Sequence, residues 1–321
     1  MKVLITGGAG FIGAHLTRFL LTRGDQVVLL DDFSSLVYST QFKKKRLEQL
    51  VGNHPAVTII EGSINDASLL DKIFKKDTFD TVIHLAAHPN PKVSLAHAHE
   101  YSMVNELGTV TLLEAMKRAG SKKLIFAGSS SIYNDAQTPF DEAASDLRPQ
   151  APYGVSKLAA EHYCRIWSEL YDFQVTVLRF FTVYGEWGRP DMAPWIFAEH
   201  ILKGETIELS RDRQRDFTYI DDIISGISKT MDVSLPSFEV INLGRGKPVD
   251  LRYFVDCMAH AAGVEAKIVD RQAPPGEMRI TFANIDKAKK LLEWQPEIPV
   301  EEGAKRLIQW LKVEQSHILK K

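Results

Sequence analysis

Tyr153 and Lys157 lie four residues apart in the sequence YGVSK, and a run of serines at 129–131 follows an apolar stretch earlier in the chain. Residues at this spacing share one face of a helix, so the lysine ammonium can stabilise a phenolate and lower the pKa of the tyrosine. A phenol with a pKa near neutrality is a usable general base, and a serine hydroxyl can relay or orient the proton. The pattern indicates proton transfer at a hydroxyl group, although YxxxK also occurs by chance at protein surfaces.

The first residues, MKVLITGGAGFIG, indicate the kind of site to which the tyrosine–lysine pair belongs. An apolar strand at 2–6 leads into three glycines, and helical periodicity follows to Leu20. Gly7 can take the tight turn, Gly10 lets the backbone approach a pyrophosphate, and Gly13 allows close packing of helix on sheet. Because a helix N-terminus stabilises an anionic diphosphate, we predict a dinucleotide-binding site here.

Asp31 follows the next predicted strand, at 26–30. A carboxylate at this place can accept hydrogen bonds from the ribose hydroxyls of the adenosine, and it would repel a 2′-phosphate. We therefore predict NAD rather than NADP as the cofactor. The alternative is that Asp31 only caps a turn.

The composition is that of a globular protein without an electrostatic partner. The 321 residues are 45% hydrophobic and 25% charged, which suits one large domain or two interlocked ones, and the net charge of −2 favours neither nucleic acid nor an anionic membrane. One basic run, residues 43–46, is interleaved with apolar Phe42, Leu47 and Leu50. We interpret this run as the solvated face of a helix.

Cysteine and histidine usage gives no metal or redox motif. Cys164 and Cys257 are far apart, and the histidines at 84, 88, 97 and 99 do not form a recognisable ligand set, so we predict no metal site. No signal peptide or membrane-spanning segment is recognisable, and a reduced cytoplasmic location is expected.

The order of apolar segments predicts the fold class. Runs typical of strands occur at 2–6, 26–30, 57–61, 81–85, 123–127 and 175–180, with helical segments between them. Such alternation predicts an α/β fold of the Rossmann type, a doubly wound parallel sheet with ligands at the carboxyl ends of its strands. We expect a NAD-binding domain at 1–184, a smaller and irregular C-terminal substrate lobe at 185–321, and a return of the chain to the first domain around 216–246.

Several motifs together resemble one family, the nucleotide-sugar epimerases and dehydratases among the extended short-chain dehydrogenases/reductases. They are GGAGFIG, HLAA, SSSIY, YGVSK, RFFTVYG, RDFTYIDD and ANIDKAKKLLEWQP, and they span essentially the whole chain. Members of this family bind NAD, oxidise a sugar hydroxyl and later return the hydride. The resemblance implies the same cofactor, a nucleotide-sugar substrate and a homodimer formed through the helices before Gly120 and after Tyr153.

The matching motifs also imply roles for single residues. Ser129 becomes the catalytic hydroxyl beside Tyr153 and Lys157, and Arg215 meets the substrate diphosphate. Ser63 departs from the family, which usually has an aspartate against adenine at this place. The implied cofactor contacts, beside the three glycines, are Phe11, Ile12, Asp31, Ile64, Leu85, Ala86, Asn105, Tyr153 and Lys157.

The residues after the catalytic serine bear on the reaction. Dehydratases that resemble this chain have Asp-Glu there and related decarboxylases have a glutamate, whereas this chain has Ser130 and Ser131. Without an acid, elimination of water lacks its proton donor, so simple inversion at C4 is favoured. We expect Tyr153 to take the O4 proton while C4 gives its hydride to NAD.

The substrate is indicated by RFFTVYGEWGRPDMA, which resembles UDP-glucuronate 4-epimerases. The Thr182 hydroxyl suits a carboxylate, helped by Ser130 and Ser131, and Arg189 suits phosphate or ribose oxygens. Lys92 stands where the family usually has an arginine, so the sugar pocket can differ. The alternatives are an epimerase of a neutral sugar nucleotide, a dehydratase or decarboxylase, and a non-catalytic NAD sensor.

Overall fold

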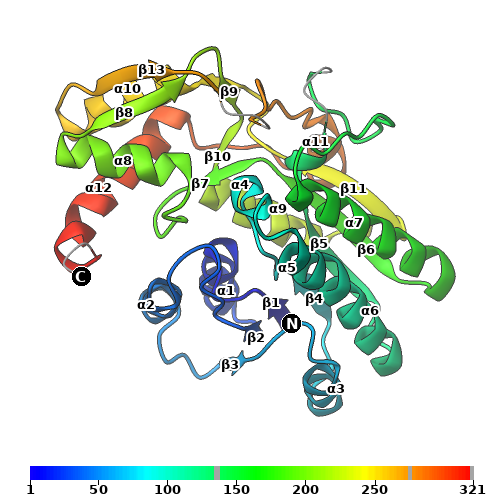
Figure 1. Cartoon of the computed structure of the whole chain (residues 1–321). Helices are drawn as coiled ribbons and strands as arrows, with labels where there is room; N and C mark the ends of the chain where they lie inside the picture. Colours follow the sequence, from blue (N-terminus) through cyan, green and yellow to red (C-terminus); the bar gives the residue numbers. More distant parts are fainter. Residues whose placement is uncertain (134–137, 274–276, 319–321) are drawn as a thin grey trace.

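A parallel sheet forms the centre of the protein in the computed structural model, which describes residues 1–133, 138–273 and 277–318 (Figure 1). Within these residues the sheet has seven strands in the order β11-β6-β5-β4-β1-β2-β3, and every neighbouring pair is parallel. The strands are β1 (Lys2–Thr6), β2 (Gln26–Asp31), β3 (Val57–Glu61), β4 (Thr81–His84), β5 (Lys123–Ser129), β6 (Gln174–Phe180) and β11 (Phe238–Leu243). The predicted Rossmann-type class is confirmed.

All six predicted strands are present, and their ends differ from the prediction by at most two residues. The sequence did not reveal β11, which pairs with β6 at the edge of the sheet. Its first three residues are only partly buried, although its sequence FEVINL is as apolar as that of the neighbouring β6, QVTVLRF. The domain boundary at 184/185 stays a prediction.

Helices cover both faces of the sheet because alternate strand residues point to opposite sides. Val3 and Ile5 of β1 pack with α1 (Phe11–Arg23) and α9 (Ile220–Asp232), whereas Leu4 packs on the other face. That second face is covered by α3 (Ala67–Lys76), α6 (Gly108–Ala119) and α7 (Pro152–Tyr171).

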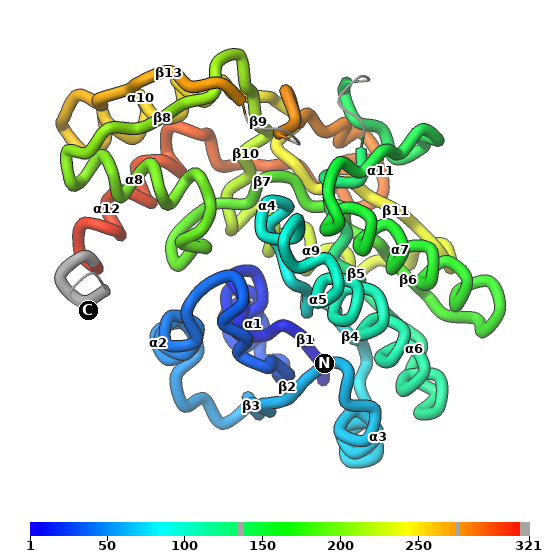
Figure 2. The backbone as a smooth tube through the Cα atoms, viewed as in Figure 1, coloured from blue at the N-terminus to red at the C-terminus, as the bar shows by residue number. Residues whose placement is uncertain are grey.

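The remaining elements lie mostly around the carboxyl ends of the strands. Figure 2 shows how the chain leaves the sheet after β6, forms a smaller lobe, and returns to the sheet at β11. In the part of the lobe that the structure describes there are three small sheets, β7 with β10, β9 with β12 and β8 with β13. These strands are β7 (Thr182–Tyr184), β8 (Thr206–Ser210), β9 (Gln214–Arg215), β10 (Phe217–Tyr219), β12 (Val249–Asp250) and β13 (Lys267–Arg271).

The other helices lie between strands of the sheet or belong to the lobe. In Figure 1, α8, α10 and α12 gather with β8 and β13 beyond one end of the sheet. The bounds of all the helices not yet given are α2 (Thr40–Leu50), α4 (Pro91–Ser94), α5 (Ala98–Tyr101), the π-helix η1 (Ser102–Leu107), the 3₁₀ turn η2 (Ser130–Ile132), α8 (Ala193–Lys203), α10 (Leu251–Ala262), α11 (Asp286–Leu292) and α12 (Val300–Ile318). Among the described helices, none is long and apolar enough to cross a membrane.

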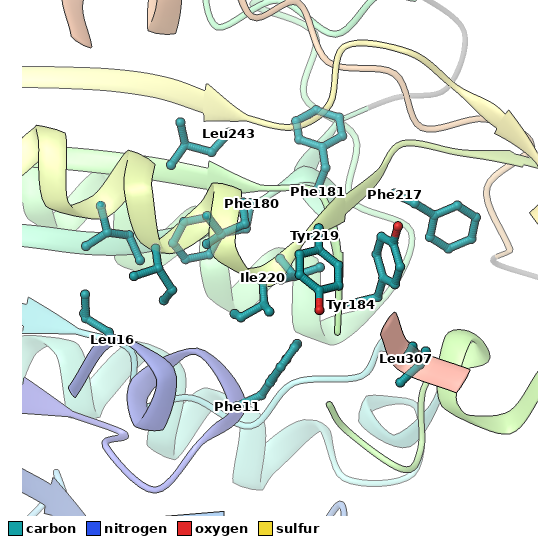
Figure 3. Packing of buried hydrophobic residues seen from close by; sticks show 14 of the residues in the cluster. Phe11, Leu16, Phe180, Phe181, Tyr184, Phe217, Tyr219, Ile220, Leu243 and Leu307 are labelled. Atoms are coloured by element: carbon teal, nitrogen blue, oxygen red, sulfur yellow. The ribbon is translucent and has the colours of Figure 1, made fainter. Parts of the chain in front are cut away.

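One hydrophobic cluster joins the lobe to the sheet. Figure 3 shows Phe11 of α1, Tyr184 of β7 and Leu307 of α12 within this cluster, together with residues of β10 and α9. The rings of Tyr184 and Tyr219 meet edge to face, with their centroids 5.5 Å apart. Because Phe11, Tyr184 and Leu307 share one buried cluster, the lobe is packed on α1 and the sheet rather than attached by a linker.

The interpretation of residues 43–46 as a solvated face is wrong for Arg46. Lys44 is exposed, but Arg46 is 0% exposed. Its guanidinium donates to the backbone carbonyls of Trp187 at 2.8 Å and Ala9 at 3.0 Å, and it lies over the ring of Phe42. Because a buried guanidinium needs acceptors, Arg46 ties the glycine turn to the loop that follows β7.

Candidate active site

Tyr153, Lys157 and Ser129 meet at the carboxyl end of β5. Pro152 occupies the first turn of α7, where a missing N–H costs nothing, so Tyr153 lies at the start of the helix. Lys157 follows one turn later and is 3% exposed. A side-chain hydrogen bond joins Tyr153 to Ser129, and all three residues line one cavity. The phenol and the serine hydroxyl therefore meet, and the lysine lines the same cavity.

The pKa of Tyr153 does not follow the expectation. Burial raises the pKa of the phenol, and the hydrogen bond with Ser129 and the charge of Arg189 oppose this shift without reversing it. We expected Lys157 to lower this pKa below its usual value, so that expectation is wrong for the protein alone. The reason is desolvation, which penalises the phenolate in a closed site.

Lys157 lies in an unusual setting for a lysine. Its ammonium lies 4.2 Å from the centre of the Phe126 ring, which attracts a cation. Burial lowers the pKa of Lys157 to about 8, although Cys164 and Glu161 raise it. Glu161, one turn further along α7, is itself engaged by Arg179 through a buried ion pair. A lysine in this setting can change its charge near neutral pH.

The glycine turn leaves no room for side chains. Gly7 has a φ of 72°, and a Cβ there would lie 2.6 Å from the backbone nitrogen of Ala86. A Cβ on Gly13 would lie 2.4 Å from the carbonyl oxygen of Gly7. The first turn of α1 therefore meets the strand ends closely, with its N-terminal N–H groups at the cavity wall, which is the arrangement that a pyrophosphate requires.

Asp31 both braces this turn and faces the cavity. Its carboxylate accepts hydrogen bonds from Ala9 N at 2.9 Å and from Phe33 N at 2.8 Å, one on each oxygen. Each oxygen keeps a further lone pair, so the carboxylate can also accept from a diol. The two readings of Asp31, as a turn brace and as a ribose acceptor, are compatible, and the residues of this wall fit a bound NAD.

A single cavity of about 780 Å³ runs from the glycine turn to the small lobe. A volume of this size holds a cofactor and a substrate together. The predicted site residues that line it are Gly7, Gly10, Phe11, Ile12, Gly13, Asp31, Ile64, Leu85, Ala86, Lys92, Ser129, Ser130, Ser131, Tyr153, Lys157, Thr182, Arg189 and Arg215.

Asn105 is the predicted cofactor residue that lies behind the cavity wall. It is 1% exposed, its amide oxygen accepts from His88 N, and its amide nitrogen donates to His88 O and to Ser156. These contacts brace the loop after β4 against α7, so a direct contact with NAD stays a prediction. Ser63, the departure beside adenine, accepts from Asn65 N in a local turn.

Three cationic side chains, Arg189, Arg215 and Lys92, line the part of the cavity where we predicted the substrate, and their partners differ. Arg189 forms a side-on pair with Asp191, at 3.1 Å from Nε and 2.6 Å from Nη2. Arg215 lies 3.5 Å from the carboxylate of Glu277, which also lies 3.4 Å from Arg271. Lys92 is exposed at the start of α4. A diphosphate in this part of the cavity would meet several positive groups.

The sequence analysis missed several lining residues. They contribute polar groups near the predicted set, and most of them come from segments whose sequence carries no recognised motif. They include Lys43, Asn90, Asp191, Ser210, Arg271 and Glu277. RPDMA was a usable signal for Asp191, since Arg189 was chosen from the same motif. In the described residues, no group of three or more His, Cys, Asp or Glu residues could hold a metal ion.

Residues 3–244 match the NAD dependent epimerase/dehydratase family. The chain belongs to this family. It is 38% identical to the UDP-glucuronate 4-epimerase of Thermodesulfobacterium geofontis over 312 residues, which cover 96% of this chain and 95% of that protein.

Two solved structures of the family resemble this one closely. One is the UDP-glucuronic acid 4-epimerase of Bacillus cereus with UDP-glucuronic acid and NAD, which has a TM-score of 0.90, 31% identity, and coverage of 98% of this chain and 99% of that one. The other is the UDP-glucose 4-epimerase of Thermotoga maritima with UDP-glucose, with a TM-score of 0.87, 28% identity and the same coverage. NAD is the cofactor that the family membership assigns to the glycine-turn site of this epimerase-family chain.

Proposed function

We propose that the protein is an NAD-dependent UDP-glucuronate 4-epimerase that forms UDP-galacturonate through a 4-keto intermediate. The observation that carries the proposal is that Thr182 lies in the same cavity as Ser129, Tyr153 and Lys157, with serines instead of acids at 130 and 131. The 38% identity to a UDP-glucuronate 4-epimerase supports the choice of substrate.

Three side chains of this protein are assigned to the proton transfer. Tyr153 takes the proton from O4 of the sugar, Ser129 orients it through the hydrogen bond between the two side chains, and Lys157, in the same cavity, is the cation assigned to the phenolate once NAD is bound. When bound, NAD would supply the hydride acceptor for C4 and a positive charge. Because serines stand at 130 and 131, the position beside the catalytic serine offers no acid for loss of water, and the ketone is reduced again after the ring has turned.

Thr182 has a further task in this reaction. A ketone at C4 of a uronate makes a β-keto acid, which loses carbon dioxide when the bond from C5 to the carboxyl group aligns with the ketone π system. An epimerase must hold the carboxylate out of alignment while the ring turns. The backbone N–H of Thr182 is fixed by the carbonyl of Asp216 at 3.1 Å, so β7 can present its hydroxyl at a defined place.

The substrate test compares nucleotide sugars directly. We expect the purified protein to turn over UDP-glucuronate much faster than UDP-glucose, UDP-galactose or the dTDP, GDP and CDP sugars, with products resolved by NMR. The carboxylate contact is lost in the neutral sugars, which costs binding in the transition state. Faster turnover of UDP-glucose would replace this proposal with a neutral-sugar epimerase.

Thr182→Val tests the carboxylate hold. Valine keeps the shape of threonine and removes the hydroxyl, so epimerisation of UDP-glucuronate should slow about tenfold, the worth of one hydrogen bond to a charged group. The share of 4-keto-pentose by-product should rise in the same NMR assay. Thr176→Val, on the neighbouring β6 and outside the cavity lining, is the matched control. An unchanged product ratio in Thr182→Val would remove this role from Thr182.

We also propose a cytoplasmic homodimer. Apolar side chains are exposed on η1 and α7, the region in which we expect contact, with Leu107 at 46%, Val155 at 54% and Leu170 at 66%. Exposed apolar side chains are common where subunits meet. The two cysteines are unpaired, which agrees with a reducing compartment.

A further inference from the structure

Asn90 adopts an unusual backbone conformation at the edge of the cavity. Its φ of 83° lies in the left-handed region, which asparagine tolerates better than most residues. Its amide oxygen accepts from Lys92 N at 3.0 Å and from Val93 N at 3.4 Å, so it caps α4. Prolines on both sides restrict the loop further. The direction of this side chain is therefore well defined.

The other end of the same amide reaches across the cavity. Its Nδ2 donates to Asp191 Oδ2 at 2.7 Å, which joins the loop after β4 to the loop after β7. That carboxylate oxygen also accepts from Arg189 Nη2 at 2.6 Å, and Asp191 Oδ1 accepts from Arg189 Nε at 3.1 Å. Asn90, Asp191 and Arg189 thus form one chain of hydrogen bonds, and all three line the cavity.

These hydrogen bonds fix the orientation of the Arg189 guanidinium. The Arg189 and Asp191 side chains are only 15% and 16% exposed, so their ion pair is shielded from water. Burial alone would lower the pKa of Arg189, but the Asp191 carboxylate raises it above its usual range. A guanidinium has more N–H donors than the two that Asp191 engages, and the remaining donors can meet a phosphate.

We propose that Asn90 is a positioning residue for the substrate's diphosphate, which it serves by holding Asp191 and, through Asp191, the Arg189 guanidinium. This inference rests on the proposed function, because it takes a nucleoside diphosphate as the ligand of Arg189. The competing account is that Asn90 only caps α4 and orients the backbone of Lys92. The two accounts differ in whether Asn90 needs Asp191 in order to affect binding of the diphosphate.

The test measures UDP binding to the NAD-loaded protein by calorimetry. Asn90→Gly removes the amide without straining a backbone that glycine adopts freely. We expect UDP to bind about tenfold more weakly, the worth of a hydrogen bond to a charged group, while uridine, measured by ligand-observed NMR, binds as before. Asn53→Gly, at an exposed turn residue, should leave both affinities unchanged.

A double-mutant cycle decides between the two accounts. If Asn90 acts through Asp191, Asn90→Gly should cause no further loss of UDP affinity in a chain that already carries Asp191→Ala. An equal loss in both backgrounds would show that the cap on α4 is responsible and would overturn the proposal. Unchanged UDP affinity in Asn90→Gly, or a wild type that binds UDP no tighter than uridine, would overturn it as well.

The proposed function fails separately. It fails if UDP-glucuronate is not epimerised, and that result leaves the measured UDP affinities and the cycle intact. Conversely, a failed cycle leaves the substrate preference of the wild type untouched. The two outcomes are therefore distinguishable.

Discussion

Tyr153→Phe should reduce epimerisation by about a thousandfold and leave NAD bound. The phenol is the proton acceptor for O4, and a phenyl ring cannot replace it. The ring itself would stay in place, because its edge-to-face contact with Tyr101, at a centroid distance of 6.2 Å, does not need the hydroxyl. Turnover is measured by NMR, and NAD content by assay of the extracted cofactor.

Tyr153→Phe should affect turnover and not NAD content, because different residues are responsible for the two. In the proposed mechanism the glycine turn and Asp31 bind the cofactor, whereas Tyr153 contacts the reacting hydroxyl. Tyr163→Phe, on the same helix but outside the cavity lining, is the control and should behave as wild type. Near-normal turnover of Tyr153→Phe would contradict the mechanism.

Much of this site could be predicted because its signals are local. A strand, three glycines and a helix are adjacent in the chain, and Tyr153 and Lys157 share one turn of α7, so spacing alone places them. The six predicted strands were likewise indicated by short apolar runs. β11 was missed although its run FEVINL is apolar, because it follows the lobe segment, in which the regular alternation of strands and helices is interrupted.

Contacts between distant segments could not be predicted in the same way. The bond from Asn90 to Asp191 joins residues 101 positions apart, and it exists only because two loops meet over the cavity. Burial of Tyr153 is also a property of the assembled fold, which is why the expected fall in its pKa was wrong. Arg46 is a different case, since it shares a helical face with Phe42 and Leu50 at intervals of four. That spacing was a usable sign of burial.

Lys157→Met should abolish turnover and yet stabilise the fold at pH 7. Burial lowers the pKa of Lys157 from 10.5 to about 8, so at pH 7 the folded protein holds an ammonium at a cost. A shift of this size corresponds to about 3 kcal/mol, and loss of the contact with Phe126 offsets about 1 kcal/mol, so we expect a gain of about 2 kcal/mol in the free energy of unfolding. Denaturant unfolding at pH 7 measures it.

The sign of the pH dependence makes this prediction specific to the charge. Between pH 8 and 10.5 the unfolded chain keeps a proton that the folded chain has released, so the contribution of Lys157 to stability rises with pH across this window. The advantage of Lys157→Met over wild type should therefore be largest below pH 8 and shrink as the pH rises towards 10. Lys75→Met, at an exposed position on α3, should show no such trend. A methionine variant that is less stable than wild type at pH 7 would show instead that the ammonium is well solvated by its neighbours, and the low pKa would then be discarded along with the stability gain.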